Sequence, residues 1–487
     1  MMKTCPAILA AILFASTSAS ALAAAASHEE AARLVGVFQT YLGQEPGVVA
    51  VMPAGEAYDV KIDFAPLIAK FKPPNFSAEV SPVVVKLTDQ GGGKWLVTQD
   101  SPLSYSGNVP GQLDMTVKIG ALKSSTVFDQ NVSAFTSSTY DIADLAVDET
   151  ITTPEAASMH VAYNVKALHY ETTSAPSGAD ALDGTFHMAM SGIMETIGVP
   201  ASPPGGQPMD ITVTAETGIQ DGTVKGFRAK AIYQLIAWFV AHPSEEAIKA
   251  NQAELKTLAS AGLPLFENVT ATGALQNLSV TTPVGPVGIA SLGFDVGLNG
   301  LVENGMLHEG FRAEGLSLPP GLVPPFAADL VPHSIALDFK VADFNLASPA
   351  KMLLEMLDLS EAKPTTPEED AKLLTALLPK GKVEISMGPS KVTGKLYDLG
   401  FEGAMTAGPV GVPVGVATIK AKGLEEVMKT LQAAPPEMVS QAIPALIAAK
   451  GMAKTEADGS LSWKIENTIS GTVLINGIDV SKMGGGG

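Results

Sequence analysis

Cysteine is almost missing from this sequence, since Cys5 is the only one among 487 residues. It lies near the N-terminus, where Lys3 precedes an apolar run at residues 7–14 and Ala21-Leu22-Ala23 forms an A-x-A site. This order is typical of a secretory signal peptide, which is removed on export. We therefore expect residues 1–23 to be cleaved and the mature chain to be periplasmic, with no disulfide, no thiolate nucleophile and no cysteine metal site.

Charged residues are also scarce, at 17% of the chain, and acidic residues predominate among them. Asp and Glu number 50 against 31 Lys and Arg, which gives a net charge of −19. Because an acidic chain repels polyphosphate, we expect no nucleic-acid partner. The hydrophobic share of 46% is high enough for a large core, or for an apolar groove in addition to a core.

Long hydrophobic runs are missing as well. A membrane-spanning helix needs about 20 apolar residues. The most apolar stretch of the later chain, AIYQLIAWFVA at residues 231–241, would cover only about half of a bilayer. The sequence therefore predicts no transmembrane span in the mature protein.

Catalytic signatures are missing too. The seven histidines form no pair one helical turn apart, and no Gly-x-Ser-x-Gly elbow, phosphate loop or dinucleotide fingerprint occurs. Ser348-Pro349-Ala350-Lys351 fits S-x-x-K, but no companion box accompanies it, so we interpret Ser348 as a helix cap. We expect no catalytic residue, no metal site and no cofactor.

The dominant positive signal is alternation of apolar and polar residues with period two. In residues 57–64 (AYDVKIDF), Tyr58, Val60, Ile62 and Phe64 share one side. The same alternation occurs at residues 113–119, 209–213, 334–341, 383–387 and 461–465. Such strands are buried on one face and wet on the other, which favours antiparallel pairing. The predicted fold is α+β: an extended, twisted, mostly antiparallel sheet with helices packed on its apolar face.

Helix signals interrupt these strands. Ser27 and Thr366 each begin a capping box, the latter for a helix that we expect to reach residue 378. Further helices are expected at residues 228–241, 245–261 and 423–433. After residues 1–23 we divide the chain into a β-rich region at 24–225, a helical pair with a β layer at 226–331, and a β layer with helices at 332–487. The later two regions are expected to continue the N-terminal sheet.

One short phrase occurs twice. Gly285-Pro286-Val287-Gly288 matches Gly408-Pro409-Val410-Gly411, 123 positions later. A Gly/Pro bend before a strand lets a sheet turn sharply and continue. We interpret the pair as the beginnings of two similar β layers, with coincidence in a Gly/Val-rich chain as the alternative.

The apolar stretch at residues 231–241 is the most suggestive feature for binding. Apolar side chains occupy more than one stripe of this helix, so most of its surface needs to be covered by other parts of the protein or by a ligand. Burial beneath the sheet is one interpretation, and a groove for acyl chains is the other. The candidates for the lining of such a groove are Ile232, Leu235, Ile236, Phe239 and Phe326.

The C-terminal half resembles a known family. The stretches are LVPHSIALDFKVADFNLASPAKMLLEMLDL, VTGKLYDLGFEGAMTAGPVGVPVGVATIKAKGLEEVMKTLQAAPPEM and IAAKGMAKTEADGSLSWKIENTISGTVLINGIDVSKM. They are similar to a family of exported Gram-negative proteins of alphaproteobacterial type, catalogued only as a domain of unknown function. The likeness is strongest over residues 318–483. It implies export and one continuous β-rich architecture, but no activity.

These observations favour a non-enzymatic protein of the cell envelope that binds or shields an apolar ligand such as lipid. Its expected partners are lipid or envelope proteins. One alternative is a structural or interaction protein of the periplasm whose apolar face is simply its core. The other is a hydrolase whose site is assembled from distant residues, for which the sequence offers no named candidates.

Overall fold

A computed structural model describes residues 25–70, 76–153, 156–178, 180–200, 209–360 and 364–480. The expected signal peptide at 1–23, most of the Pro/Gly-rich segment at 200–208, whose composition predicts a loop, and the terminal glycines at 484–487 lie outside these residues. The chain divides into two compact units. Unit 1 consists of Met1–Val269 and Lys351–Pro364, and unit 2 of Thr270–Ala350 and Thr365–Gly487.

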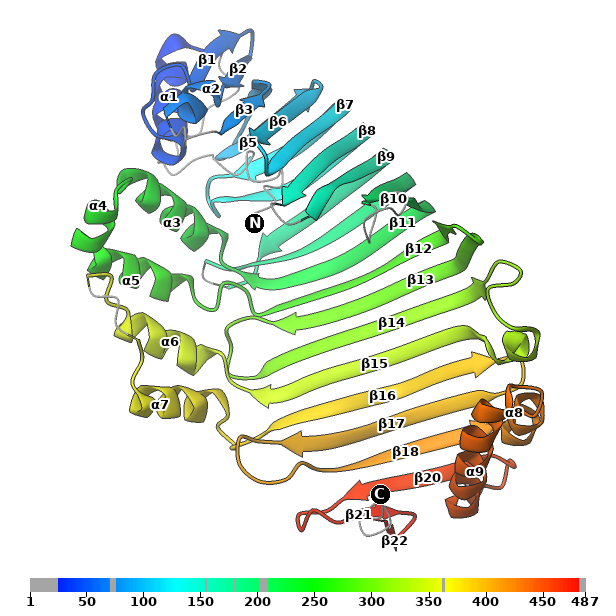
Figure 1. Cartoon of the computed structure of the whole chain (residues 1–487). Helices are drawn as coiled ribbons and strands as arrows, with labels where there is room; N and C mark the ends of the chain where they lie inside the picture. Colours follow the sequence, from blue (N-terminus) through cyan, green and yellow to red (C-terminus); the bar gives the residue numbers. More distant parts are fainter. Residues whose placement is uncertain are drawn as a thin grey trace. The chain divides into compact units, whose positions relative to one another are not determined.

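Unit 1 is built mainly from antiparallel strands (Figure 1). Its strands are β1 (Val49–Ala54), β2 (Ala57–Ile62), β3 (Ser77–Val80), β4 (Val83–Gly91), β5 (Lys94–Asp100), β6 (Leu103–Val109), β7 (Leu113–Asp129), β8 (Ala134–Thr153), β9 (Ala156–Pro176), β10 (Leu182–Val199) and β11 (Met209–Phe227). The order β1–β2–β4–β5–β7 continues through β8, β9 and β10 to β11. The first half of β7 pairs with β6, which in turn pairs with β3. The predicted mostly antiparallel sheet is confirmed.

Three consecutive glycines between two strand-like segments predict a hairpin, and Gly91 to Gly93 form one between β4 and β5. Gly91, Gly92 and Gly93 all have positive φ angles, from 64° to 80°. This left-handed backbone costs glycine little, because glycine has no Cβ. The turn sets Lys86 opposite Thr98 and Asp89 opposite Trp95, and Trp95 is buried in the core.

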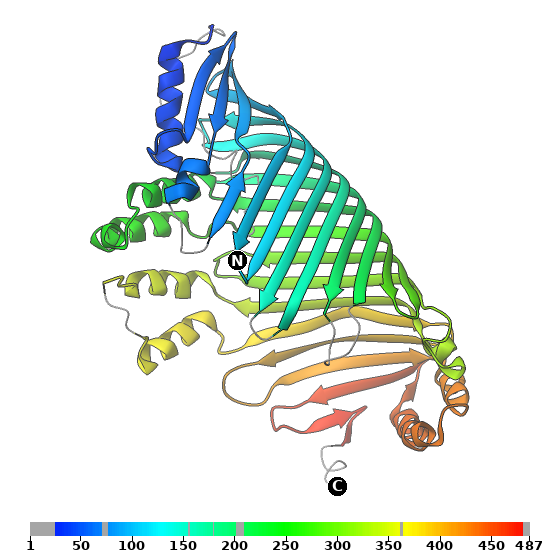
Figure 2. The same ribbon diagram turned by 45° about the horizontal axis from the view of Figure 1, so that its top comes forward.

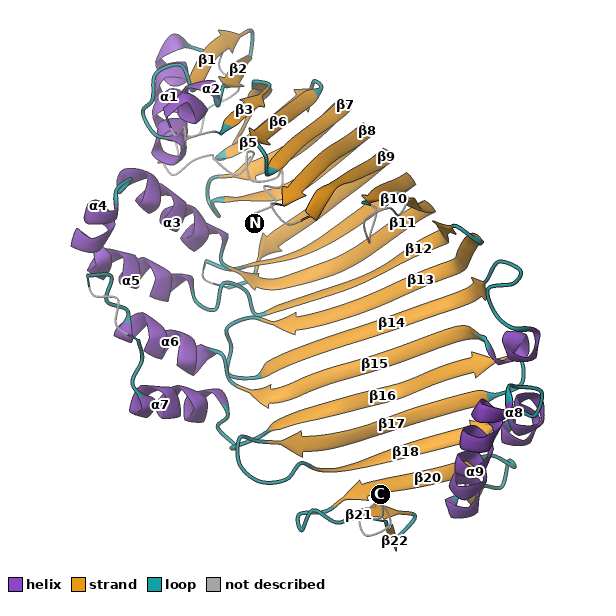
Figure 3. Ribbon diagram, in the orientation of Figure 1, coloured by secondary structure: helices purple, strands orange, loops and turns teal. Residues whose placement is uncertain are grey.

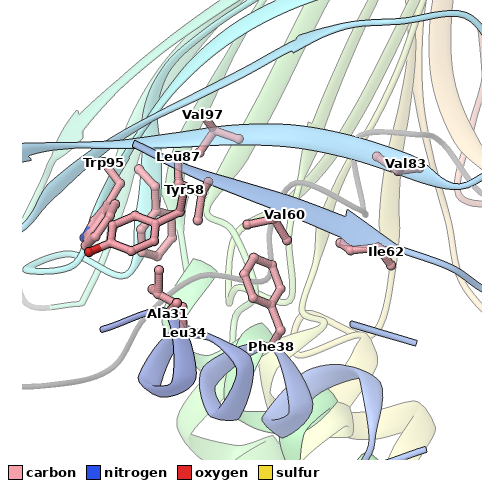
Figure 4. Close-up of a cluster of buried hydrophobic side chains, with 11 residues drawn as sticks. Ala31, Leu34, Phe38, Tyr58, Val60, Ile62, Val83, Leu87, Trp95 and Val97 are labelled. Atoms are coloured by element: carbon pink, nitrogen blue, oxygen red, sulfur yellow. The ribbon is translucent and has the colours of Figure 1, made fainter. Parts of the chain in front are cut away.

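The hydrophobic core of unit 1 lies between a helix and the first strands. Helix α1 (His28–Leu42) begins at Ser27, whose hydroxyl accepts a hydrogen bond from the Glu30 backbone N–H at 3.1 Å. Leu34 and Phe38 lie one turn apart, so they project from one face of the helix. They pack on apolar side chains of β2, β4 and β5 (Figure 4). Fully buried members of this core are Leu34, Phe38, Val60, Ile62, Leu87 and Phe128.

The long strands β7 to β11 run side by side (Figure 2). Along β7 the buried positions shift phase, because Ile119 and Leu122 are both buried although they are three residues apart. The shift is opposite Asp144 of β8, which has a φ of 53°. A residue with left-handed backbone interrupts the alternation of the pleat. Apolar side chains before and after the interruption can therefore both point to the core along a 17-residue strand.

The helical part of unit 1 follows β11. Helices α3 (Ala229–Ala241), α4 (Glu245–Ala250) and α5 (Gln252–Gly262) confirm the expected pair, with one more break at Asn251. Helix α3 packs against α1 and α5. The short helix α2 (Ala65–Lys70) follows strand β2. The two boundaries between the units lie within strand β12 (Asn268–Thr282) and within helix α6 (Ala347–Met356).

Unit 2 contains an antiparallel meander. Its strands are β13 (Gly285–Asn299), β14 (Gly305–Ser317), β15 (Pro332–Phe344), β16 (Val383–Gly394), β17 (Asp398–Ala407), β18 (Val414–Lys422), β19 (Lys454–Thr455), β20 (Leu461–Asn467), β21 (Val473–Ile475) and β22 (Ile478–Asp479). Neighbours in the chain pair in order from β13 to β18, and β18 then pairs with β20. The helices are η2 (Pro325–Leu330), α7 (Pro367–Leu377), α8 (Leu424–Leu431) and α9 (Pro436–Met452).

Helices cover unit 2 less than the sequence predicts. Helix α7 has the complete capping box of Thr366 and Glu369, yet Figure 3 shows it beyond the ends of the strands. Helix α9 contacts β20, where the Trp463 Nε1–H donates to the Ala449 carbonyl at 2.7 Å. These helices are inserted in connections that return to the strand end they left, and such connections place an insertion at the sheet margin. The predicted helical cover of the apolar face is therefore wrong for most of unit 2.

The two GPVG phrases do not adopt the same structure. Gly285 begins β13 with a φ of 122°, whereas residues 408–413 form an exposed loop before β18. Helix α8 begins at Leu424, but Leu301, which is 123 positions earlier and would correspond to it in a repeat, lies in a bend. The first phrase lies within β13 and the second precedes β18, so the interpretation as two similar layers is not supported.

None of the helices in the described part of the chain has both the length and the apolar character that crossing a membrane requires.

Candidate functional site

One face of the unit 2 meander is apolar, and its residues are placed by strand register. Directly paired residues of antiparallel strands point to the same face. The register links Phe294 of β13 to Phe311 of β14, and Phe311 to Leu337 of β15. Three further rows of linked residues run parallel to this one. They are Leu298, Leu307, Val341, Ile385 and Met405; Val296, Glu309, Phe339, Met387 and Gly403; and Leu292, Ala313, Ile335, Val392 and Leu399.

These four rows are called the apolar face below. They extend seven residues along β13 and across five strands, which is roughly 20 Å by roughly 19 Å. Glu309 is the one charged residue among them. Large side chains of the face keep 36 to 40% of their surface exposed: Phe294, Val296, Leu298, Phe311, Leu337, Phe339, Met387 and Met405. Isolated exposed hydrophobic residues are ordinary on proteins, whereas a contiguous set of this size makes the face a candidate binding surface.

The opposite side of the same strands is polar. Between the apolar residues of β15 lie Ser334, Ala336, Asp338 and Lys340. On β14 the alternating residues include His308, Gly310 and Arg312. The alternation thus separates a polar face from an apolar one, as predicted for these strands, but the apolar one is left partly open.

A charged cluster lies at the centre of the polar face. The register sets Gly310 of β14 between Asp295 of β13 and Asp338 of β15. His308 Nε2 lies 3.0 Å from Asp338 Oδ2, and His308 Nδ1 lies 3.5 Å from Asp295 Oδ1. Arg312 Nη1 donates to Asp295 Oδ2 at 2.8 Å. A Cβ at Gly310 would overlap the Asp295 carboxylate, so glycine leaves the space that the cluster occupies.

This cluster could offer ligands to a metal ion. Asp295, His308 and Asp338 each present one ligand atom, and these atoms all lie within 4.8 Å of one another. The mixture of imidazole and carboxylate suits a transition metal. However, Arg312 already contributes a positive charge to Asp295, and the imidazole already bonds Asp338. The contacts therefore describe a network of polar contacts across three strands, in which Arg312 and Asp295 form an ion pair.

Histidine–carboxylate pairs also occur across the strands of unit 1. His160 Nε2 lies 2.9 Å from Asp148, His169 Nδ1 lies 2.7 Å from Asp141, and His187 Nδ1 lies 2.7 Å from Asp221. All three pairs are solvent-accessible, so each stabilises the fold only slightly. The hydrogen bond to the Asp141 carboxylate raises the pKa of His169 above its usual 6.5.

The raised pKa of His169 gives a pH-dependent contribution to stability. Because the folded pKa exceeds the unfolded one, the stabilisation is fully present below pH 6.5 and disappears as the pH rises through the folded value. We expect an NMR titration to give a His169 pKa above 6.5 in the native chain and a lower one in Asp141→Asn. The control Asp148→Asn, which changes the partner of His160, should leave the His169 titration unchanged. An unaltered His169 curve in Asp141→Asn would contradict the assignment.

The predicted groove residues are placed on two different elements. Ile232, Leu235, Ile236 and Phe239 belong to α3 in unit 1, and Phe326 belongs to η2 in unit 2. Ile236 and Phe239 are exposed, while the other three are half-buried. Neither unit by itself brings these five residues together.

Aromatic packing explains the apolar character of α3. Trp238 is buried, lies edge-on to Phe239 with ring centroids 5.2 Å apart, and stacks on His242 at 4.2 Å. At the beginning of the helix, Ala229 joins Ala134 and Leu182 in a small cluster beside Tyr233. Burial raises the pKa of Tyr233 to about 12. The helix therefore combines buried packing with the exposed pair Ile236 and Phe239.

Ser348 is not the helix cap that the sequence indicates. Its backbone N–H donates to Asn345 Oδ1 at 3.0 Å, and its hydroxyl accepts from Asn345 Nδ2 at 3.1 Å. Asn345 thus caps the helix, and Ser348 lies in the first turn. The structural interpretation of Ser348 holds, although the capping residue is three positions earlier.

Sequence reasoning missed part of the apolar face. It identified Ile335, Leu337, Phe339 and Val341, but not Phe294 of β13 or Phe311 of β14. Both strands contain several glycines, which weaken a strand signal. The alternation of Leu292, Phe294, Val296 and Leu298 was the signal that could have found them.

Comparisons with protein-family models, with curated protein sequences and with solved structures each returned no match.

Proposed function

We propose that this protein is an exported, non-catalytic component of the Gram-negative cell envelope that binds lipid acyl chains on the apolar face. The observation that carries the proposal is the set of large, partly exposed apolar side chains on five neighbouring strands of unit 2. The N-terminal signal-like segment and the resemblance to exported Gram-negative proteins support the periplasmic location. Low charge on the face favours a hydrocarbon ligand over a polar one.

The size of the face suits a chain-like ligand. Each methylene buried against apolar side chains contributes about 0.8 kcal/mol. An acyl chain that buries about eight methylenes would gain about 6 kcal/mol. The entropy lost on association subtracts from this gain, so the Kd would be no tighter than about tens of micromolar. The proposal therefore predicts reversible binding of single-chain or two-chain lipids.

Glu309 limits the type of ligand. It lies between Val296 and Phe339 in its row and carries a negative charge at neutral pH. An anionic headgroup placed beside it would be repelled. The headgroup of a bound lipid is therefore expected to lie away from the middle of the face, with the hydrocarbon over the phenylalanines.

The experiment is a search for bound lipid. The mature chain is purified from the envelope without detergent, extracted with organic solvent and analysed by mass spectrometry, and the delipidated protein is titrated with a fluorescent fatty acid. We expect stoichiometric lipid and saturable uptake. Protein that carries no lipid and takes up no fatty acid would contradict the proposal and favour a structural role, in which another envelope protein covers the face.

A further inference from the structure

Two loops of unit 2 form an apolar tip. One is the loop at residues 408–413 between β17 and β18, and the other is the turn at residues 468–472 between β20 and β21. Because Gly415 of β18 pairs with Asn467 of β20, the two loops leave the sheet at the same end. The exposed fraction is 90% for Val410 and 87% for Ile469. These values are far above those of the apolar face itself.

The tip is held together by polar contacts at its base. Asn467 Nδ2 donates to the Pro413 carbonyl at 2.6 Å and joins the two loops. The Thr468 hydroxyl closes the second turn by accepting from the Thr472 backbone N–H at 3.1 Å. Val412 lies next to Gly471, at 3.8 Å from the position that a Cβ there would take. Val410 and Ile469 therefore project from loops that hydrogen bonds hold in place.

The chemistry of the tip is uncharged throughout. No charged residue occurs between Glu402 and Lys420, or between Glu466 and Asp479. Every residue from 408 to 414 is exposed to solvent. Two nearly fully exposed aliphatic side chains on neighbouring uncharged loops make the tip a candidate apolar contact surface.

We propose that the tip docks on the surface of a lipid bilayer by inserting Val410, Val412 and Ile469 into the interface. A chain with a net charge of −19 gains nothing from electrostatic attraction to anionic lipid, so the contact must be apolar. Met405 of the apolar face lies just before the first loop on β17. Docking would thus bring one end of the apolar face to the membrane, from which lipid could reach it.

The test uses vesicle flotation with the full mature chain after delipidation. One set of vesicles contains phosphatidylethanolamine and phosphatidylglycerol, and the other contains only phosphatidylcholine. We expect the protein to float with both sets and to remain bound at high salt. The variant Val410→Asp/Ile469→Asp should lose at least tenfold in vesicle partitioning, because each carboxylate would have to enter the interface.

The control is Val284→Asp, which changes a valine that is 57% exposed just before β13, at the end of this sheet opposite to the tip. It should keep partitioning within twofold of the native value. Native protein that fails to float, or an equal loss in the control, would overturn the proposal. A soluble dimer that the tip variant dissociates would instead assign the tip to a second copy of the chain, and the membrane proposal would be wrong.

Two variants test the docking proposal and the acyl-binding proposal independently of each other. The variant Val296→Asp, on the apolar face, should lose fatty-acid uptake but keep flotation. The tip variant should keep fatty-acid uptake from solution but lose flotation. Circular dichroism and thermal melting confirm that each variant is folded before either measurement.

Discussion

Replacement of Phe38 by alanine is expected to lower the free energy of unfolding by about 3–5 kcal/mol. The Phe38 side chain is 2% exposed and lies between α1 and the sheet, among Leu34, Val60 and Ile62. Its removal takes away the transfer free energy of a full aromatic ring and leaves a cavity that the strands cannot fill, because their positions are fixed by pairing on both sides of β2.

A matched control is available in the same unit. Phe239→Ala removes the same atoms from a helix, but Phe239 is 47% exposed, so the expected loss is below about 1.5 kcal/mol. Urea unfolding of both variants, followed by circular dichroism, gives the comparison. Equal losses would show that α1 does not pack on the strands as described.

Replacement of Val296 by aspartate is expected to reduce fatty-acid affinity at least tenfold, which corresponds to about 1.4 kcal/mol. The side chain lies on the apolar face, directly across from Glu309. A bound acyl chain would cover the new carboxylate, and a carboxylate that loses its water without a partner is strongly unfavourable. The substitution therefore raises the free energy of the ligand-bound state more than that of the free protein.

Val416→Asp is the matched control for this prediction. Val416 of β18 has a similar exposure and also lies directly across from a glutamate, Glu466. The register pairs it with Ala404, which is adjacent to Met405 and points to the opposite face. Both variants thus introduce aspartate into a strand beside a carboxylate, but only one changes the apolar face. Equal affinities in a fluorescent fatty-acid titration would contradict the proposed binding surface.

Sequence patterns predicted well those elements that depend only on residues close together in the chain. The Thr366 capping box, the hairpin at Gly91 to Gly93 and the alternation at Ile335 to Val341 are all present. Each depends on neighbours within a few residues of the chain, so the sequence contains the needed information. The helix break at Asn251 and the capping of α6 by Asn345 differ by a few positions, which is the range over which helix ends compete.

The candidate site could not be predicted from such local patterns. Whether Phe339 is covered or exposed depends on where the intervening helices lie, and a helical pattern does not state which surface the helix packs on. The candidates on α3 came from a helix whose apolar character is partly explained by Trp238 stacking on His242. Likewise, Asp295, His308 and Asp338 meet only through strand register, which no local pattern specifies.

The most direct test of the account is a photocrosslinking map of the ligand. The delipidated mature chain is loaded with a fatty acid that carries a diazirine near the end of its chain, irradiated, digested and analysed by mass spectrometry. We expect adducts on Phe294, Phe311, Leu337 and Phe339, and their loss in Val296→Asp. Adducts confined to the polar face or to α3, with none on these residues, would contradict binding on the apolar face.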